Sequence, residues 1–260
     1  MAGTLYLGSQ KVCPAVILGG EKTVARYVVE DGVAKPNSTE LVGNEFDDIT
    51  QIDAHSFYYA FYYCQNLTGN LQFKNLQKIS SAGMAYAFYG AKITSVNFPV
   101  LTEIMFGGMV YAFYETSVTS INFPSLIEIG RYGMQYAFQK INISSISFPS
   151  LINVGELGLH STFSQCSLLE NVYFPSLTTV GSQGLAAAFG WCSNLENVYF
   201  NAMKSDNSFH IGSLQNMIQN CSDVTLHFPS NVEAKVQSLY GYPNFSGINT
   251  TILYDLPATE

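Results

Sequence analysis

Charged side chains are scarce in this sequence. Of its 260 residues, 11 are Lys or Arg and 19 are Asp or Glu, and together they make up 12% of the chain, which is roughly half of the usual share. The net charge is −8 and no run of basic residues occurs. These features argue against a nucleic-acid partner, because binding to phosphates needs clustered Lys and Arg.

Long apolar runs are also missing. No stretch approaches the ~18 apolar residues of a membrane span, so we expect no membrane insertion. The first twenty residues, MAGTLYLGSQKVCPAVILGG, lack the basic and long apolar segments of a signal peptide. We therefore expect a cytoplasmic protein, unless it reaches the outside on a virion or after cell lysis.

The motifs of catalysis and of cofactor or metal binding are missing as well. The sequence has no phosphate loop, no dinucleotide fingerprint and no Cys-x-x-Cys pair. Its histidines follow no nucleophile arrangement. They are His55, His160, His210 and His227. We expect no catalytic residue, no cofactor and no metal.

An internal repeat, by contrast, runs through most of the chain. One landmark is a phenylalanine that is usually followed by proline, with spacings of 25, 25, 25, 26, 26 and 28 residues. It occurs at Phe73, Phe98, Phe123, Phe148, Phe174, Phe200 and Phe228. A second landmark, usually Ala-Phe, recurs with nearly the same period at Phe61, Phe88, Phe113, Phe138, Phe163 and Phe189. Two landmarks with one period predict a solenoid of about seven stacked coils.

Each period carries the pattern of one coil. Residues 93–98 alternate apolar and polar side chains, which predicts a strand with one buried face, and Pro99 ends it. A second short apolar element follows over 101–104, and Phe113 returns to the interior. We expect both phenylalanine columns to be buried.

The coil resembles the BspA-type leucine-rich repeats of bacterial surface proteins. The resemblance covers roughly residues 50–230 and is carried by stretches such as CSLLENVYFPSLTTVG (166–181) and CSNLENVYF (192–200). It implies a β-rich solenoid, which we expect to be right-handed with coils of 25–26 residues, used for adhesion and recognition. It implies no catalytic residue. The opening LYLGSQKVCPAVILGG is similar to N-terminal pieces of phage and prophage tail-associated proteins.

The two ends depart from the repeat. We predict an N-terminal cap or attachment segment over 1–48, the solenoid over 49–228, and a C-terminal cap over 229–260. The first twenty residues suggest a β-hairpin. Residues 232–241 suggest a short helix, and the last six residues are expected to fray.

Four of the five cysteines share one repeat position, and we interpret them as buried free thiols. They are Cys64, Cys166, Cys192 and Cys221, with Gly90, Glu115 and Lys140 at that position in the other coils. A disulfide between Cys166 and Cys192 on adjacent coils is the alternative.

Two exposed columns are candidate binding sites. The first is formed by Tyr59, Tyr86, Tyr111 and Tyr136, whose rings suit sugars or protein interfaces; the preferred alternative is that they stack on one another and cover the corners. The second is the outward strand face, which carries Asn97, Asn122, Ser147, Tyr173 and Tyr199, with Ser95, Ser120, Ser145, Asn171 and Asn197 beside them.

The main functional hypothesis is a non-enzymatic module that binds a cell-surface glycan or protein. It could be a phage or prophage tail component whose N-terminal segment contacts other tail proteins. One alternative is a structural spacer or assembly protein without a ligand. Another is a carbohydrate-active enzyme using stacked carboxylates, such as Glu103 with Glu128 or Glu170 with Glu196; solvated like charges are the simpler explanation.

Overall fold

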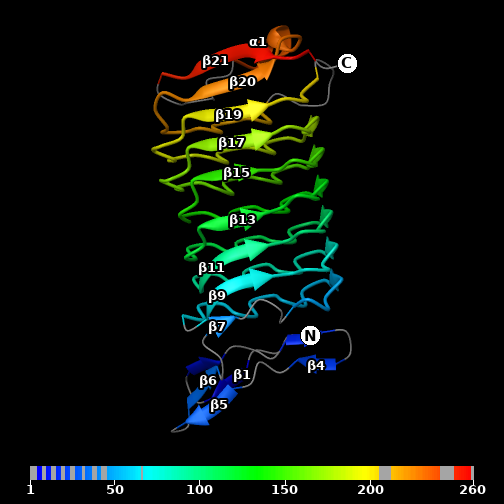
Figure 1. The fold of residues 1–260 in the computed structure, drawn as a ribbon, viewed down its shortest axis with the longest axis vertical. Coiled ribbons are helices and arrows are strands. Elements are labelled where there is room, and N and C mark those ends of the chain that lie inside the picture. Colours follow the sequence, from blue (N-terminus) through cyan, green and yellow to red (C-terminus); the bar gives the residue numbers. More distant parts are fainter. Residues whose placement is uncertain are drawn as a thin grey trace.

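A computed structural model shows a rod of about seven stacked β coils (Figure 1). It describes residues 46–65, 67–204, 212–240 and 249–258, except for the side chains of 238–240, together with the strand backbones within the first 45 residues. The predicted β-rich leucine-rich-repeat solenoid is therefore confirmed.

Three antiparallel hairpins precede the rod. They pair β1 (Leu5–Leu7) with β2 (Gln10–Val12), β3 (Val16–Leu18) with β4 (Glu21–Thr23), and β5 (Tyr27–Glu30) with β6 (Val33–Pro36). The next strand, β7 (Glu40–Leu41), already pairs in parallel with the first full strand of the solenoid.

The longer strands of the coils form one side of the rod, whose outward surface we call the strand face. Each strand ends near the Phe-Pro landmark, where proline lacks the donor needed to continue the ladder. One parallel sheet contains β7, β9 (Thr68–Gln72), β11 (Lys92–Asn97) and β13 (Ser120–Asn122). A second contains β15 (Ser145–Ser147), β17 (Asn171–Phe174), β19 (Asn197–Phe200), β20 (Thr225–Pro229) and β21 (Thr251–Leu256). The ladder is thus interrupted between β13 and β15.

A second side of the rod is an uninterrupted six-stranded parallel sheet of two-residue strands. It contains β8 (Gln51–Ile52), β10 (Lys78–Ile79), β12 (Glu103–Ile104), β14 (Glu128–Ile129), β16 (Asn153–Val154) and β18 (Thr179–Val180). In each strand the second residue is buried, which leaves its first position toward solvent.

Consecutive tight turns close each coil, and we call their stacked array the turn ladder. Along the turns, successive backbone N–H groups donate alternately to a carbonyl oxygen of the same coil and to a carbonyl oxygen of the next coil. Ala112 N–H, for example, donates to Met109 O at 3.0 Å, whereas Phe113 N–H donates to Ala137 O at 2.8 Å. The turns require a positive φ at every fourth residue, including Tyr111 (φ 53°) and Glu115 (φ 55°).

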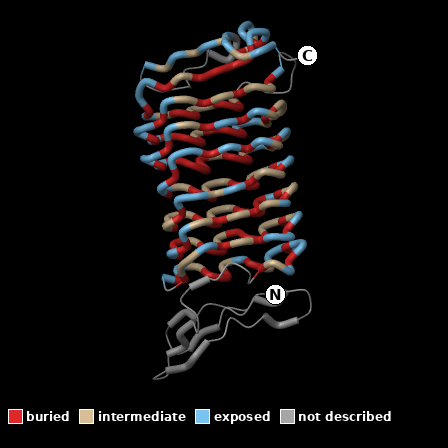
Figure 2. The backbone as a smooth tube through the Cα atoms, in the orientation of Figure 1, coloured by how far each residue is buried: buried red, intermediate tan, exposed pale blue. Residues whose placement is uncertain are grey.

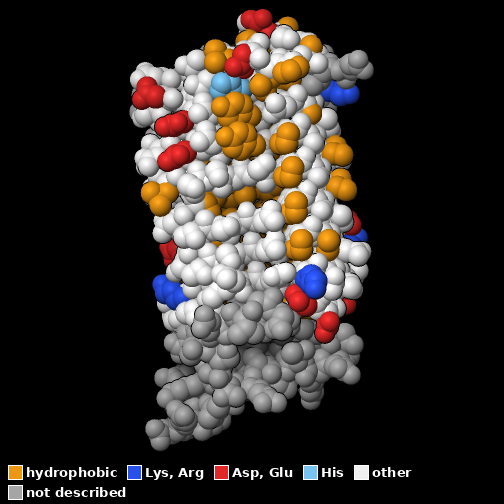
Figure 3. Space-filling model, in the orientation of Figure 1, with side chains coloured by type: hydrophobic (Ala, Val, Ile, Leu, Met, Phe, Trp, Pro, Cys, Tyr) orange, Lys and Arg blue, Asp and Glu red, His pale blue; other side chains and the backbone are white. Residues whose placement is uncertain are grey.

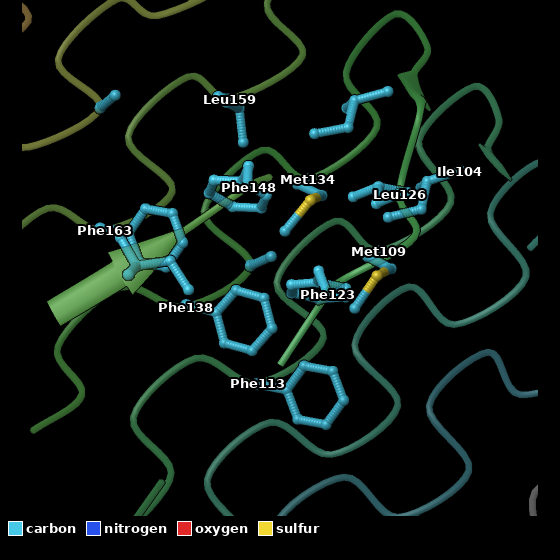
Figure 4. Close-up of a cluster of buried hydrophobic side chains, with 14 of the residues drawn as sticks. Ile104, Met109, Phe113, Phe123, Leu126, Met134, Phe138, Phe148, Leu159 and Phe163 are labelled. Carbon is cyan, nitrogen blue, oxygen red and sulfur yellow. The ribbon is translucent and has the colours of Figure 1, made fainter. Parts of the chain in front are cut away.

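The two phenylalanine columns are buried in the interior, as predicted. Figure 2 shows buried residues recurring in every coil of the rod. Phe113 stacks between Phe88 and Phe138 with centroid distances of 5.3 and 5.0 Å. The second column interlocks with the first through edge contacts such as Phe98 to Phe113 at 6.3 Å. Figure 4 shows Phe113, Phe138 and Phe163 in one row, with Phe123 and Phe148 beside them.

The C-terminal segment contains helix α1 (Glu233–Tyr240), which confirms the helix predicted over 232–241. The prediction that the last six residues fray is wrong for Asp255 and Leu256. Both belong to β21, which pairs in parallel with β20 and extends the sheet. The apolar side chains Ile252 and Tyr254 pack against the core and hold this strand in place.

Candidate functional site

The predicted tyrosine column exists and its rings stack on one another. Centroid distances are 4.6 Å between Tyr59 and Tyr86, 5.0 Å between Tyr86 and Tyr111, and 4.6 Å between Tyr111 and Tyr136, with interplanar angles of 16° or less. The column ends where His160 meets the Tyr136 ring edge-on at 5.2 Å. All four tyrosines are half-buried.

A second tyrosine column lies beside the first and was missed in the sequence. Tyr62, Tyr89 and Tyr114 occupy the position just after the buried phenylalanine, with centroid distances of 5.0 and 4.6 Å between neighbours. The signal was the repeated Tyr-x-Phe-Tyr pattern, in which tyrosines flank the phenylalanine on both sides. Because the flanking positions are three residues apart across one tight turn, both rings point outward from the same corner.

Together with Tyr58 and Tyr63, the two columns form a continuous patch that we call the tyrosine surface. Its members are Tyr58, Tyr59, Tyr62, Tyr63, Tyr86, Tyr89, Tyr111, Tyr114 and Tyr136. Stacking covers the flat faces of the rings within each column. The surface therefore presents ring edges and hydroxyl groups, which suits hydrogen bonding across an interface better than the stacking of a sugar ring.

Burial changes the acidity of these tyrosines. Desolvation, followed by repulsion from neighbouring phenols, raises the pKa of Tyr59 and of Tyr111 to about 12, and it also raises the pKa of Tyr62, Tyr86 and Tyr89. An unfolded chain ionises its tyrosines near pH ~10. Stability is therefore expected to fall as the pH rises from 10 to 12, because only the unfolded state has lost its protons there.

We expect the phenolate absorbance at 295 nm to rise in two phases, with one group of tyrosines titrating clearly above pH 11. The Tyr111→Phe variant keeps the ring and removes one hydroxyl, so the late phase should lose amplitude in that variant. A single titration near pH 10 for all tyrosines, in protein that is still folded by circular dichroism, would contradict this burial.

The outward strand columns form polar ladders, in the predicted register. Asn97 pairs with Asn122, and Asn122 Nδ2 donates to Asn97 Oδ1 at 3.0 Å. In the neighbouring column Asn197 Nδ2 donates to Asn171 Oδ1, also at 3.0 Å. These amides partly satisfy one another, as hydroxyl and amide ladders can.

Aromatic rings continue the strand face toward the C-terminal end. Tyr173 stacks on Tyr199 at 5.0 Å, and Tyr199 stacks on His227 at 4.3 Å. His227 Nδ1 lies 2.9 Å from Asp255 Oδ2, and its Nε2 lies 3.3 Å from Asn197 Oδ1. The histidine thus connects β19, β20 and β21, which fits a structural role for a side chain that is only 9% exposed.

Comparison with known proteins identifies the repeat. A family model described as the BspA type leucine rich repeat region matches in six copies, over residues 45–132 and 109–244. The chain belongs to the BspA-type leucine-rich repeat family. Comparison with curated proteins and with solved structures gave no match. Membership indicates a role in protein interaction or adhesion in general, in a family that is typically non-enzymatic.

The BspA-type coils of this chain bury three free thiols. Each thiol donates a hydrogen bond to the carbonyl oxygen of the Ala-Phe landmark phenylalanine in the preceding coil. The pairs are Cys166 with Phe138, Cys192 with Phe163 and Cys221 with Phe189, at 3.1–3.3 Å. Burial raises the pKa of Cys166 to about 12 and that of Cys221 to about 11, and it raises the pKa of Cys192 as well. Thiols held this way are poor nucleophiles.

Two cysteine predictions need correction. Cys64 is disulfide-bonded rather than a free thiol, and its partner lies outside the described residues. The position equivalent to the cysteines is also not the one predicted, because the turn ladder aligns Gly90, Glu115 and Lys140 with Tyr63 and Trp191. The true equivalents are the buried residues Ala91, Thr116 and Ile141, so the position selects for burial.

The carboxylate pairs proposed for an enzyme lie on open surfaces. Glu103 and Glu128 are neighbours in the six-stranded sheet, and Glu103 forms a 2.8 Å ion pair with Lys78. Glu170 and Glu196 are both exposed. In the described ranges no three His, Cys, Asp or Glu side chains lie close enough to hold a metal ion. No helix in the described part of the chain has the length and apolar character of a membrane span.

Proposed function

We propose that the protein is a non-enzymatic recognition module that binds a cell-surface glycan or protein through its tyrosine surface. The observation that carries the proposal is the gathering of nine half-buried or exposed tyrosines on one corner of the first four coils. Tyrosine offers a large contact area and a hydroxyl group at a low entropic cost, and it is enriched where proteins recognise partners.

The stacked tyrosines occupy a turn position with a left-handed backbone. Tyr59, Tyr86, Tyr111 and Tyr136 have φ angles of 53–57°, a left-handed conformation that costs a bulky residue on the order of 1 kcal/mol. The later coils place smaller residues there, Ser161, Ala187 and Asn216. The turn imposes this conformation whatever the size of the side chain, since Leu157 and Trp191 adopt it as well, so the choice of tyrosine in four successive coils concerns the side chain and not the backbone.

The alternative is a spacer or assembly protein, and the mutual stacking of the rings favours it. Stacking alone offsets part of the strain, since an aromatic pair contributes about 0.5–1.5 kcal/mol beyond its buried area. The two functions differ in whether loss of the rings abolishes contact with a cell.

The test is binding to a panel of bacterial and animal cells, measured by flow cytometry with the labelled protein. We expect Tyr86→Ala/Tyr111→Ala/Tyr136→Ala to lose binding while its circular dichroism at 20 °C is unchanged. The matched control is Ile127→Ala/Ile152→Ala, which removes exposed apolar side chains from another side of the rod and should bind normally. Retained binding by the tyrosine triple variant would exclude the tyrosine surface as the site, and no cell binding by the unaltered protein would support the spacer instead.

Attachment to a phage or prophage tail is the finer part of the proposal. It is supported by the resemblance of residues 5–20, of which the structure describes strand backbones alone. We propose that the segment 1–48 contacts other tail proteins and that the solenoid points toward the host. On that basis the protein would be virion-associated, or extracellular after lysis.

A further inference from the structure

The strand face has a local defect at the interruption between β13 and β15. These strands belong to different sheets, although both neighbouring sides of the rod continue through the same coils. The rings of Phe123 and Phe148 lie 5.8 Å apart there, compared with 5.1 Å for Phe98 and Phe123 one coil earlier. Spacings of 5.5 Å between Phe148 and Phe174 and 6.0 Å between Phe163 and Phe189 occur where the strands pair normally, so the defect lies in the strand pairing and not in the spacing of the coils.

A hollow lies in the surface where the strand pairing is interrupted. Ile121 is half-buried, whereas its equivalents Val96 and Ile146 are only 1% and 3% exposed. Figure 3 shows the front of the molecule hollowed between β13 and β15, with hydrophobic side chains at the bottom. The floor of the hollow is thus apolar.

One wall of the hollow is the flat face of an aromatic ring. Tyr173 stacks on Tyr199 with an interplanar angle of 5°, so its other face points along the column toward Ser147. Serine at that position is exposed and too small to cover the ring, and Tyr173 is 39% exposed. The aromatic column of Tyr173, Tyr199 and His227 therefore ends at Ser147, next to the interruption between β13 and β15.

The rim of the hollow is polar and uncharged. Asn122 uses one amide hydrogen toward Asn97 and is exposed, which leaves hydrogen-bonding capacity on its outer side. The hydroxyl groups of Ser120, Ser145 and Ser147 are also exposed. Along β13, β15 and β17 no residue is charged, and Glu170 lies one residue before β17.

We propose that this hollow binds a neutral pyranose ring of a glycan, stacked on Tyr173 above Ser147. The apolar face of the sugar would complete the aromatic column, and its hydroxyl groups would bond to Asn122 and to the serines. This inference deepens the proposed recognition function, but it rests on a site separate from the tyrosine surface. The absence of cationic side chains along these strands argues for neutral rather than acidic sugars.

The experiment uses the full chain on an array of neutral, sialylated and sulfated oligosaccharides, followed by calorimetric titration with the best neutral glycan. We expect retention of neutral glycans and a loss of affinity of tenfold or more in two variants. Tyr173→Ala removes the platform. Ser147→Tyr extends the stack and fills the hollow, with the fold kept by the same register that joins Ser147 to Tyr173.

The matched control is Gln72→Tyr, which places a tyrosine in the same outward column on β9, three coils away. It should bind like the unaltered protein, as should the tyrosine triple variant. Normal glycan binding by Ser147→Tyr, equal loss in Gln72→Tyr, or a preference for acidic glycans would overturn the site. An array without neutral hits would overturn it too, and cell binding that still depends on the tyrosine surface would then indicate a protein partner.

Discussion

Replacing Phe113 with alanine is expected to lower the free energy of unfolding by about 3–5 kcal/mol. The ring is fully buried and stacked between Phe88 and Phe138, with the edge of Phe98 on its flank. Removal leaves a cavity the size of a benzene ring. The neighbours cannot collapse into it, because the hydrogen bonds from Phe113 to the next coil hold the backbone spacing.

Urea unfolding of Phe113→Ala should be followed by two signals. Far-UV circular dichroism reports all coils, whereas the fluorescence of the single tryptophan, Trp191, reports the sixth coil. The control is Phe106→Ala in the same coil, where the ring is 54% exposed and the expected change is within about 0.5 kcal/mol. If the free energy of unfolding of Phe113→Ala fell by less than about 1 kcal/mol, this ring would not be an important part of the core.

Replacing Gly181 with alanine is expected to destabilise the protein by about 1–3 kcal/mol through overpacking. A Cβ atom on Gly181 would lie 2.7 Å from Glu156 N and 2.8 Å from Gly155 C. Both atoms belong to the backbone of the preceding coil, so no side chain can rotate away. The coils must separate locally, which stretches the bond from Gly181 N–H to Val154 O, now 2.8 Å long.

The matched control for this prediction is Gly190→Ala. Gly190 is buried and Gly181 is half-buried, but a Cβ added to Gly190 would meet its nearest atom at 3.4 Å, an ordinary contact distance. Alanine there should be neutral or slightly stabilising, because it restricts the unfolded chain. Equal melting temperatures for the two variants would show that coil spacing adapts freely and would contradict the steric argument.

Much of the architecture was predictable because a repeat makes each residue a member of a column. The spacing of Phe98, Phe123 and Phe148 predicts their burial and stacking, since equivalent positions must superimpose when coils stack. The same reasoning placed Tyr111 beside Tyr86. It failed where alignment of the columns slipped by one residue, as for Gly90 and Cys64, because the turn ladder alternates inward and outward residues and a slip of one reverses the side.

Other features depend on tertiary geometry that a periodic pattern does not contain. The disulfide of Cys64 breaks the repeat, whose other cysteines are free thiols. The separation of β13 from β15 has no clear signal in the sequence, since Ile121 and Ile146 look alike there. The pairing of β21 with β20 joins segments about 26 residues apart, but without the Phe-Pro landmark. Candidate binding residues stay predictions until a ligand is tested.

The interrupted strand ladder also bears on the mechanics of the rod. At the level of β13 and β15 the six-stranded sheet and the turn ladder still join the coils, whereas the strand face does not. A beam that is continuous on two sides and notched on the third bends most easily at the notch. Flexing of this rod is therefore expected to concentrate there, with the two halves pivoting on the six-stranded sheet, and anything seated in the notch would stiffen the whole molecule.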